Sequence, residues 1–262
     1  MSDQSQGSPL FVQESGDETG APILFIHGFP LTGQMWEPAV AQMPEEYRCI
    51  IPDLRGLGES DVSGKPSMTA YADDLAGLLD DIGEKRPVVV VALSMGGYVA
   101  FEFFRRHRAS IKALALVDTR ANADSAEARA GRMKMIESVR SSGSKAVADA
   151  MIEKLFAANV DPELKQEWYE IMSSQPPEGV IGALQAMADR PDSTPTLATI
   201  DCPALFICGE HDVITPPDVH REMHAAVSGS RLEIVAESGH MMPLERTDEF
   251  TNILCEFLET LE

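Results

Sequence analysis

The sequence predicts a doubly wound α/β fold in which a mostly parallel sheet is covered by helices and carries one inserted helical cap. Three observations favour this fold class. Short apolar runs rich in β-branched residues recur along the chain, helical patterns alternate with them, and one long stretch has helical patterns but no strand. The 262 residues are enough for a single large core.

Six apolar runs are predicted to be strands. Most of them are apolar at consecutive positions, which is typical of strands in a parallel sheet that is covered on both faces. In chain order they are residues 23–26, 48–51, 88–93, 112–117, 204–208 and 232–235.

Two helical patterns between and after these runs are the clearest. The first begins after Ser67, a plausible N-cap, and ends before Gly83, which readily takes the positive φ that follows many helices. The second closes the chain, with apolar residues at helical spacing from Phe250 to Leu261. Strands and helices therefore alternate outside the insertion.

The insertion occupies residues 120–196 and contains five prolines but no strand pattern. A helical insertion between core strands predicts a cap above the carboxyl edge of the sheet, where open α/β sheets bind ligands. We expect residues 1–119 and 197–262 to form the core. Five methionines in the cap are interpreted as ordinary helix packing rather than a pliable substrate pocket. They are Met133, Met135, Met151, Met172 and Met187.

Net charge limits the candidate partners. Twenty-one basic and 42 acidic residues give a formal charge of −21, which disfavours nucleic acid and anionic membrane surfaces. The N-terminus lacks the pattern of a signal peptide, and no apolar run reaches the roughly 18 residues of a membrane span. We expect a cytoplasmic protein whose partner is a small molecule; the sequence does not predict an oligomeric state.

The four cysteines stand in apolar stretches without the spacing of a zinc site. We interpret them as free buried thiols and expect neither a metal nor a cofactor. They are Cys49, Cys202, Cys208 and Cys255.

Ser94 is the candidate nucleophile. It follows the predicted strand 88–93 and precedes a helical pattern, and a serine at such a strained corner projects its hydroxyl out of the sheet. The corner needs small residues two positions away on each side, which here are Ala92 and Gly96. Glycine is usual where Ala92 stands, but one extra methyl group should leave the elbow intact. The alternative is a plain strand-to-helix turn.

Five short segments form a recognisable set. They are Ile26-His27-Gly28-Phe29-Pro30, Asp53-Leu54-Arg55-Gly56-Leu57-Gly58-Glu59-Ser60, the Ser94 elbow, Gly209-Glu210-His211-Asp212 and Gly239-His240-Met241. Together they resemble the α/β-hydrolase superfamily, and within it the small capped branch of esterases, enol-lactonases and perhydrolases. The resemblance spans nearly the whole chain and implies a serine hydrolase that cleaves carboxylic esters through an acyl-serine intermediate, without a cofactor.

A serine hydroxyl needs a nearby base, and the base needs a group that fixes its tautomer. Among six histidines, His240 lies in the loop after the predicted strand 232–235, where the resemblance places the base. The acid is expected to be Asp212, which follows strand 204–208, so that the chain order is serine, acid, histidine. Asp118 at the end of the preceding core strand is the competitor, and Glu210 is a third choice.

The other histidines receive structural interpretations. The resemblance implies that His27 supports the oxyanion loop, and His211 is interpreted as a loop residue. His107 stands among arginines at a helix end and should be solvated. His220 and His224 lie four residues apart on a charged helical pattern and are predicted to be at the surface.

The resemblance also implies two oxyanion donors, the backbone N–H groups of Phe29 and Met95. Phe29 and Trp36 are candidates to line the substrate pocket, although for Trp36 the sequence favours a packed core aromatic. Arg120 and Arg190 could bind a substrate carboxylate.

The reaction itself stays open between several alternatives. A carboxylic ester or a lactone is the expected substrate. An enol-lactonase and a cofactor-free perhydrolase would use the same triad, as would a hydrolase of carbon–carbon bonds. A non-catalytic ligand-binding protein of this fold is the alternative from another class.

Overall fold

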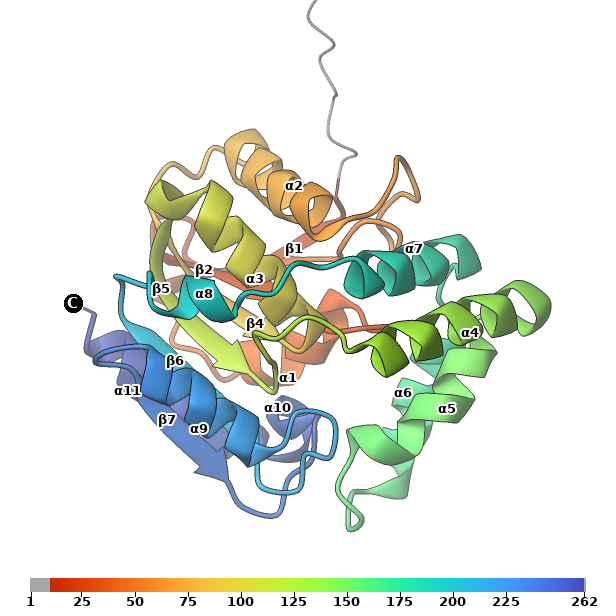
Figure 1. Ribbon diagram of the computed structural model, residues 1–262. Helices are drawn as coiled ribbons and strands as arrows, with labels where there is room; N and C mark the ends of the chain where they lie inside the picture. The colour runs from red at the N-terminus through yellow and green to blue at the C-terminus, as the bar shows by residue number, and fades with distance from the viewer. Residues whose placement is uncertain (1–9, 262) are drawn as a thin grey trace, which may run out of the picture.

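The computed structural model describes residues 10–261. Its centre is a seven-stranded sheet in the order β1-β3-β2-β4-β5-β6-β7, in which only β1 is antiparallel to its neighbour (Figure 1). The strands are β1 (Val12–Gly16), β2 (Ala21–Ile26), β3 (Tyr47–Pro52), β4 (Val88–Leu93), β5 (Ile111–Val117), β6 (Ala204–Gly209) and β7 (Arg231–Val235). The predicted fold class is confirmed.

The six predicted strands all form, because their consecutive apolar residues face helices on both sides of the sheet. In β2, Ile23 and Phe25 join one core cluster, whereas Leu24 and Ile26 join the other. Side chains alternate between the faces of a strand, so a strand that is buried on both faces must be apolar throughout. β1 was not predicted because its sequence is polar and mostly exposed; it is held at the sheet edge by its backbone pairing with β3.

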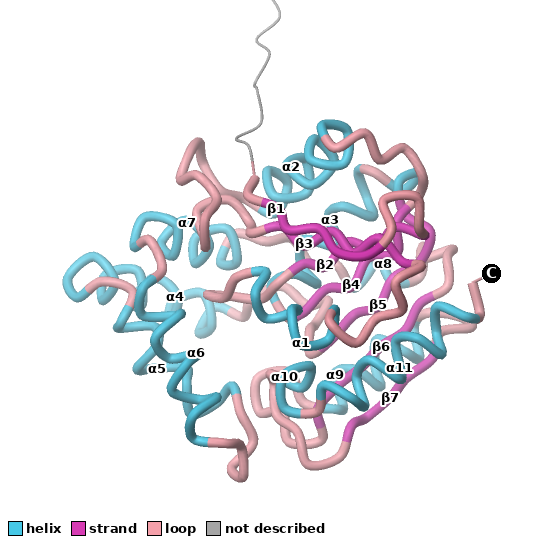
Figure 2. The backbone as a smooth tube through the Cα atoms, turned by 180° about the vertical axis from the view of Figure 1, so that it is seen from behind, coloured by secondary structure: helices cyan, strands magenta, loops and turns pink. Residues whose placement is uncertain are grey.

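Helices cover both faces of the sheet. The helices α2 (Met68–Asp81), α3 (Met95–Arg106) and α9 (Pro217–Ala226) lie on the face shown in Figure 1. On the opposite face, seen in Figure 2, lie α1 (Glu37–Val40), α10 (Met242–Glu245) and α11 (Thr247–Glu259). The short helices η1 (Gly33–Trp36), η2 (Arg108–Ser110) and α8 (Thr194–Leu197) complete the core.

The start of α2 follows the sequence prediction. The Ser67 hydroxyl accepts a hydrogen bond of 3.0 Å from the Ala70 N–H, as an N-cap does. Gly83 follows the helix with φ +73°. The C-terminal helix α11 also forms where its apolar spacing indicated.

The insertion between β5 and β6 is helical, as predicted. It consists of α4 (Ala126–Ser142), α5 (Lys145–Leu155), α6 (Pro162–Ser174) and α7 (Pro177–Ala188), with α4 beside α7 and α5 beside α6 (Figure 1). The cap touches the core closely where Gly179 of α7 meets Gly56, since a Cβ on Gly179 would lie 1.6 Å from the Gly56 carbonyl oxygen. The division at residues 120 and 196 stays a prediction.

Two expectations about burial need correction. Cys49 and Cys208 are buried, but Cys202 and Cys255 are only half-buried; all four are free thiols. His220 was predicted at the surface and is fully buried, because the face of α9 that carries Met223 packs against the sheet. Within residues 10–261, no helix is long and apolar enough to cross a membrane.

Candidate active site

Ser94 lies at the sharp turn between β4 and α3 with φ +54° and ψ −113°. Positive φ is unfavourable for a residue with a side chain, and three hydrogen bonds hold it. The Ser94 N–H donates to the Val117 carbonyl at 3.0 Å, and the Ser94 carbonyl accepts from the Thr119 hydroxyl at 2.7 Å and from the Gly97 N–H at 2.9 Å. The turn forms with the fully buried Ala92 two residues before it.

Gly96 fits the small residue that the corner requires. A Cβ at Gly96 would lie 2.4 Å from the Ile26 carbonyl oxygen, so a larger residue would push the start of α3 away from the end of β2. The turn is therefore held between the backbone of β2, which lies against Gly96, and that of β5, which accepts from the Ser94 N–H.

His240 and Asp212 complete a hydrogen-bonded chain with Ser94. The Ser94 Oγ and His240 Nε2 atoms are 2.9 Å apart, and His240 Nδ1 is 2.8 Å from Asp212 Oδ2. The His240 and Asp212 side chains are at most 2% exposed. Asp212 lies 118 positions after Ser94 in the sequence, and His240 lies 28 positions after Asp212. In space His240 stands between the other two, which is the arrangement of a nucleophile, a base and an acid.

The Asp212 carboxylate is held by the loop that follows β6. Its Oδ1 accepts from the Ile214 and Thr215 N–H groups at 2.7 and 3.0 Å, and its Oδ2 accepts from the Thr215 hydroxyl at 2.5 Å. Burial opposes the charged form, but His240 and the Thr215 hydrogen bonds outweigh it and lower the pKa of Asp212 well below its usual range. Asp212 is therefore an anion at neutral pH.

The loop that carries His240 is tied to the cap. The Met241 N–H donates to the Leu155 carbonyl at the end of α5 at 2.9 Å. Glu245 accepts from Gly239 N–H at 2.9 Å and from Ala157 N–H at 2.8 Å. The position of His240 thus depends on the docking of α5.

His27 supports the loop after β2. Its Nδ1 lies 2.7 Å from the Gly28 carbonyl and its Nε2 lies 2.8 Å from the Leu54 nitrogen, so Nδ1 carries the proton and Nε2 accepts. Burial lowers the pKa of His27, which keeps the ring neutral. This is the structural role that the resemblance implied.

Phe29 and Met95 flank Ser94 through backbone. A Cβ on Gly28 would be 3.3 Å from Ser94 Cβ, so the His27–Phe29 loop runs directly beside Ser94. Met95 is the first residue of α3. Among the hydrogen bonds of residues 10–261, neither the Phe29 nor the Met95 N–H has an acceptor. Both N–H groups remain available to an incoming oxygen.

His220 was missed as a supporting residue. Its Nε2 accepts from the Thr119 N–H at 3.1 Å, and Thr119 in turn holds the Ser94 carbonyl. Burial lowers the pKa of His220 to about 4, so the ring is neutral. Its spacing of three from Met223 on α9 and of seven from Val227, the residue after α9, was the available signal for a buried face.

The remaining histidines lie away from Ser94. His107 contacts Asp73 at 2.8 Å, His224 contacts Ser230 at 2.8 Å, and His211 is exposed. None of these three is bonded to the Ser94–His240–Asp212 chain.

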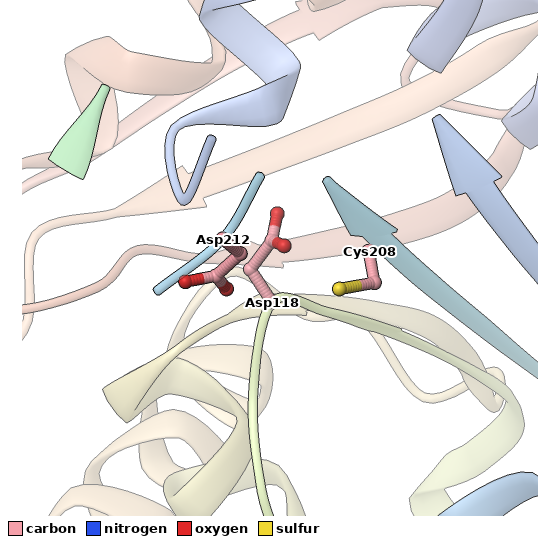
Figure 3. A group of neighbouring side chains, drawn as sticks. All are labelled: Asp118, Cys208 and Asp212. Carbon is pink, nitrogen blue, oxygen red and sulfur yellow. The ribbon is translucent and has the colours of Figure 1, made fainter. Parts of the chain in front are cut away.

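Asp118 lies beside Asp212 at the end of β5 (Figure 3). One carboxylate oxygen of each aspartate and the Cys208 sulfur lie within 4.8 Å of one another. Asp118 is fully buried; its Oδ1 accepts from the Gly209 N–H at 2.8 Å, whereas its Oδ2 has no hydrogen-bond partner. Among the hydrogen bonds of residues 10–261, His240 Nδ1 meets Asp212 and none joins His240 to Asp118.

A cavity of about 260 Å³ lies between Phe29 and the cap helices α4, α5 and α7. Its lining is apolar except for Arg132. The lining residues are Phe29, Ala128, Gly131, Arg132, Met135, Val147, Met151 and Leu184. Two of the cap methionines that were assigned to helix packing thus line a cavity.

Two arginines of the cap share one aspartate. Asp124 pairs with Arg132 and with Arg190, each at 2.5 Å, and the Arg190 guanidinium lies 4.2 Å from the centre of the Tyr98 ring. The group therefore has one positive charge in excess beside the cavity. Arg190 itself is buried in these contacts.

Two other candidate substrate contacts have different neighbours. Arg120 donates to the Ile214 carbonyl and so braces the Asp212 loop. Trp36 is fully buried and packs between Phe25 and Phe250, with ring centres 5.4 and 5.6 Å away. This environment is that of a core aromatic, the interpretation that the sequence favoured. Trp36 does not line the cavity at Phe29.

Comparisons with known proteins agree with this architecture. The model of the alpha/beta hydrolase family matches residues 23–253. The AB hydrolase superfamily protein YisY of Bacillus subtilis is 30% identical over 95% of this chain and 94% of its own. A thermophilic esterase from Thermogutta terrifontis, solved with malate bound, is 40% identical, with a TM-score of 0.93 over 96% of this chain and 93% of that chain. The enol-lactonase from Burkholderia xenovorans LB400 is 27% identical, with a TM-score of 0.90 over 97% and 98%.

Proposed function

The chain belongs to the alpha/beta hydrolase family, and we propose that it is a serine hydrolase that cleaves carboxylic esters through an acyl-Ser94 intermediate. The observation that carries this proposal is the chain Ser94–His240–Asp212, with contacts of 2.9 and 2.8 Å. The similarity to the Thermogutta esterase supports the ester as substrate.

Acylation begins when Ser94 Oγ attacks the ester carbonyl carbon while His240 Nε2 takes the hydroxyl proton. The imidazolium that forms is stabilised by the Asp212 carboxylate at Nδ1. The tetrahedral intermediate then collapses, and the alcohol leaves with the proton that His240 returns. Ser94 is left as an acyl ester.

Deacylation repeats these steps with water as nucleophile. His240 removes a proton from the water as the water oxygen attacks the acyl carbonyl carbon. When this second tetrahedral intermediate collapses, His240 returns the proton to the departing Ser94 Oγ. The products are a carboxylic acid and the free enzyme.

The negative oxygen of each tetrahedral intermediate needs donors that are already in place. Phe29 and Met95 would supply two backbone N–H groups, which stabilise such an oxygen by about 3 kcal/mol each in comparable enzymes. Both groups flank Ser94, and neither has another partner among the described residues.

The cavity at Phe29 favours a short acyl or alcohol group. Its volume of about 260 Å³ is below the roughly 300–1,000 Å³ of pockets for drug-sized ligands. Its apolar walls from α4, α5 and α7 suit an aliphatic chain.

Hydrolysis of short-chain p-nitrophenyl esters by the wild type and by Ser94→Ala tests the proposal. We expect kcat to fall by about 10⁶ in the variant, as for other serine hydrolases that lose the nucleophile. Equal rates in the two proteins would refute the role of Ser94. Binding of esters without turnover by either protein would instead indicate a non-catalytic ligand-binding protein.

A lactonase is the second candidate, and the excess positive charge of the group formed by Asp124, Arg132 and Arg190 favours it. Arg132 is the charged group on the cavity wall and could bind a substrate carboxylate, which a lactone of a dicarboxylic acid would carry. The 27% identical enol-lactonase supports this reading. A panel of esters of rising acyl length, lactones and peracid formation separates esterase, lactonase and perhydrolase.

Arg132→Leu sharpens this choice. For a carboxylate-bearing substrate we expect kcat/KM to fall about 10- to 100-fold, with little change for a neutral ester of equal length. Arg129→Leu is the matched control, since Arg129 is half-exposed and pairs with Asp189. Equal losses on both substrates would show that Arg132 only supports the cap.

A further inference from the structure

The buried carboxyl group of Asp118 has no charge that could balance its ionised form. It is fully buried at the end of β5, and no ion pair involves it in the part of the chain described, residues 10–261. Its Oδ1 accepts one N–H from Gly209 and its Oδ2 accepts none. A buried carboxylate usually accepts several hydrogen bonds or meets a cation.

The neighbours of Asp118 would oppose its charge. In the next loop Asp212 carries its own negative charge, whereas on β6 the Cys208 thiol faces Asp118 and favours its ionised form only weakly (Figure 3). His220 of α9 touches the adjacent Thr119 and is neutral, while His240 is engaged with Asp212. Arg120, the nearest residue of positive charge along the chain, donates to the Ile214 carbonyl instead.

Either a proton or a metal cation could neutralise the pair, and the geometry favours the proton. A cation shared with Asp212 would need a free lone pair there. Both Asp212 oxygens already accept two hydrogen bonds each, from Ile214, Thr215 and His240. A proton on the unpartnered Asp118 Oδ2 would face the neighbouring Asp212 carboxylate, whose negative charge favours the protonated form.

We propose that Asp118 is a neutral carboxylic acid in the folded protein, so that Asp212 is the single negative charge of the pair facing His240. Burial and the charge of Asp212 raise the pKa of Asp118 well above its usual range, which agrees with this assignment. Asp118 is thereby a positioning residue. It binds the Gly209 N–H at the start of the Asp212 loop without adding a second charge beside the base.

The consequence at His240 rests on the proposed function. A second carboxylate near the imidazole would favour the imidazolium and so shift the base toward its inactive form at neutral pH. A neutral Asp118 avoids this shift and still provides the oxygen that accepts the hydrogen bond from the Gly209 N–H.

Equilibrium unfolding in urea between pH 5 and 8 tests the proposal without relying on activity. The folded protein would keep a proton on Asp118 that the unfolded chain, with an ordinary aspartate pKa near 3.9, has released. Wild-type stability should therefore fall relative to Asp118→Asn as pH rises, because the amide cannot ionise. We expect the ratio of the two folding constants to change about tenfold per pH unit in favour of the variant.

Asp124→Asn is the matched control. The Asp124 side chain is also buried, but Arg132 and Arg190 lower its pKa. The folding constant of Asp124→Asn relative to that of the wild type should therefore not change with pH above 5. If the ratio of the folding constants of Asp118→Asn and the wild type also stays constant from pH 5 to 8, Asp118 is ionised in the folded protein and the proposal is overturned.

The acid limb of kcat/KM against pH gives an independent readout for an active preparation. Removing an ionised carboxylate would move the limb to lower pH by about one unit or more, whereas Asp118→Asn should leave its midpoint within about 0.3 unit if the residue is neutral. If the protein shows no esterase activity, the proposed function fails and the unfolding experiment still decides the state of Asp118.

Added zinc and a chelator separate the proton from a cation. We expect the unfolding curves of both proteins to be unchanged by ethylenediaminetetraacetate and by zinc chloride. A zinc-dependent stabilisation of the wild type that Asp118→Asn lacks would overturn the neutral acid in favour of a bound cation.

Discussion

The carboxyl edge of the sheet and the cap above it are built in different ways. At the edge, backbone hydrogen bonds from β5, β6 and the Asp212 loop hold Ser94 and Asp212. His240 is held by its side-chain contacts with them and by a loop that is tied to α5. In the cap, the cavity wall consists of flexible and apolar side chains such as Met135, Met151 and Leu184. The difference indicates that the edge sets the reaction and the cap sets the substrate, since backbone geometry tolerates little change and side-chain walls can be exchanged.

The largest expected effect separates the two aspartates at the edge. Asp212→Asn should lower kcat by about 10⁴, because the amide favours the wrong tautomer of His240. Asp118→Asn should lower it by less than about tenfold, since no hydrogen bond joins Asp118 to His240 among the described residues. Steady-state kinetics on a p-nitrophenyl ester measures both. The reverse order would move the acid to Asp118.

The cap should respond in selectivity rather than in reactivity. Leu184→Ala removes part of the cavity wall, and we expect the kcat/KM ratio of a longer to a shorter acyl ester to rise about tenfold. The acyl-length panel provides the measurement, and Met172→Leu, a buried cap substitution outside the cavity, is the control. An unchanged ratio in Leu184→Ala would show that the acyl chain lies elsewhere.

A smaller effect is expected for the hydrogen bond that holds the Ser94 turn. Thr119→Val keeps the shape of Thr119 but leaves the Ser94 carbonyl without this donor, which should lower the free energy of unfolding by roughly 1–3 kcal/mol. Thr119→Ser retains the hydroxyl and should restore kcat more fully than it restores stability. If valine and threonine give the same kcat, the bond does not position the nucleophile.

The acid dependence of stability tests the charge of Asp212 itself. Because the pKa of Asp212 is lowered in the folded state, its contribution is present above the unfolded pKa near 3.9 and is lost as pH falls below it. The wild type should therefore lose stability relative to Asp212→Asn between about pH 4 and 2. Urea unfolding in this range measures the free energy of unfolding of the two proteins. A difference between them that does not change with pH would contradict the lowered pKa of Asp212.

Local signals explain why much of the fold was predictable. The run at residues 88–93 is apolar at every position, so its burial on both faces could be recognised without knowledge of its neighbours. β1 gave no such signal, because pairing with β3 through the backbone requires no particular side chains. His220 was misplaced for a related reason: charged neighbours on α9 hid the narrow face that packs inward.

The sequence by itself determined the residue types and their order: a serine in a strand-to-helix turn, then aspartates at strand ends, then His240 in the last core loop. These are local patterns that short-range sterics dictate. Only the tertiary structure decided that Asp212 meets His240 while Asp118 is left beside it without a balancing charge, and that Phe29 rather than Trp36 faces the cap. Those outcomes depend on the pairing of β5 with β6 and on the docking of distant helices, which no local pattern encodes.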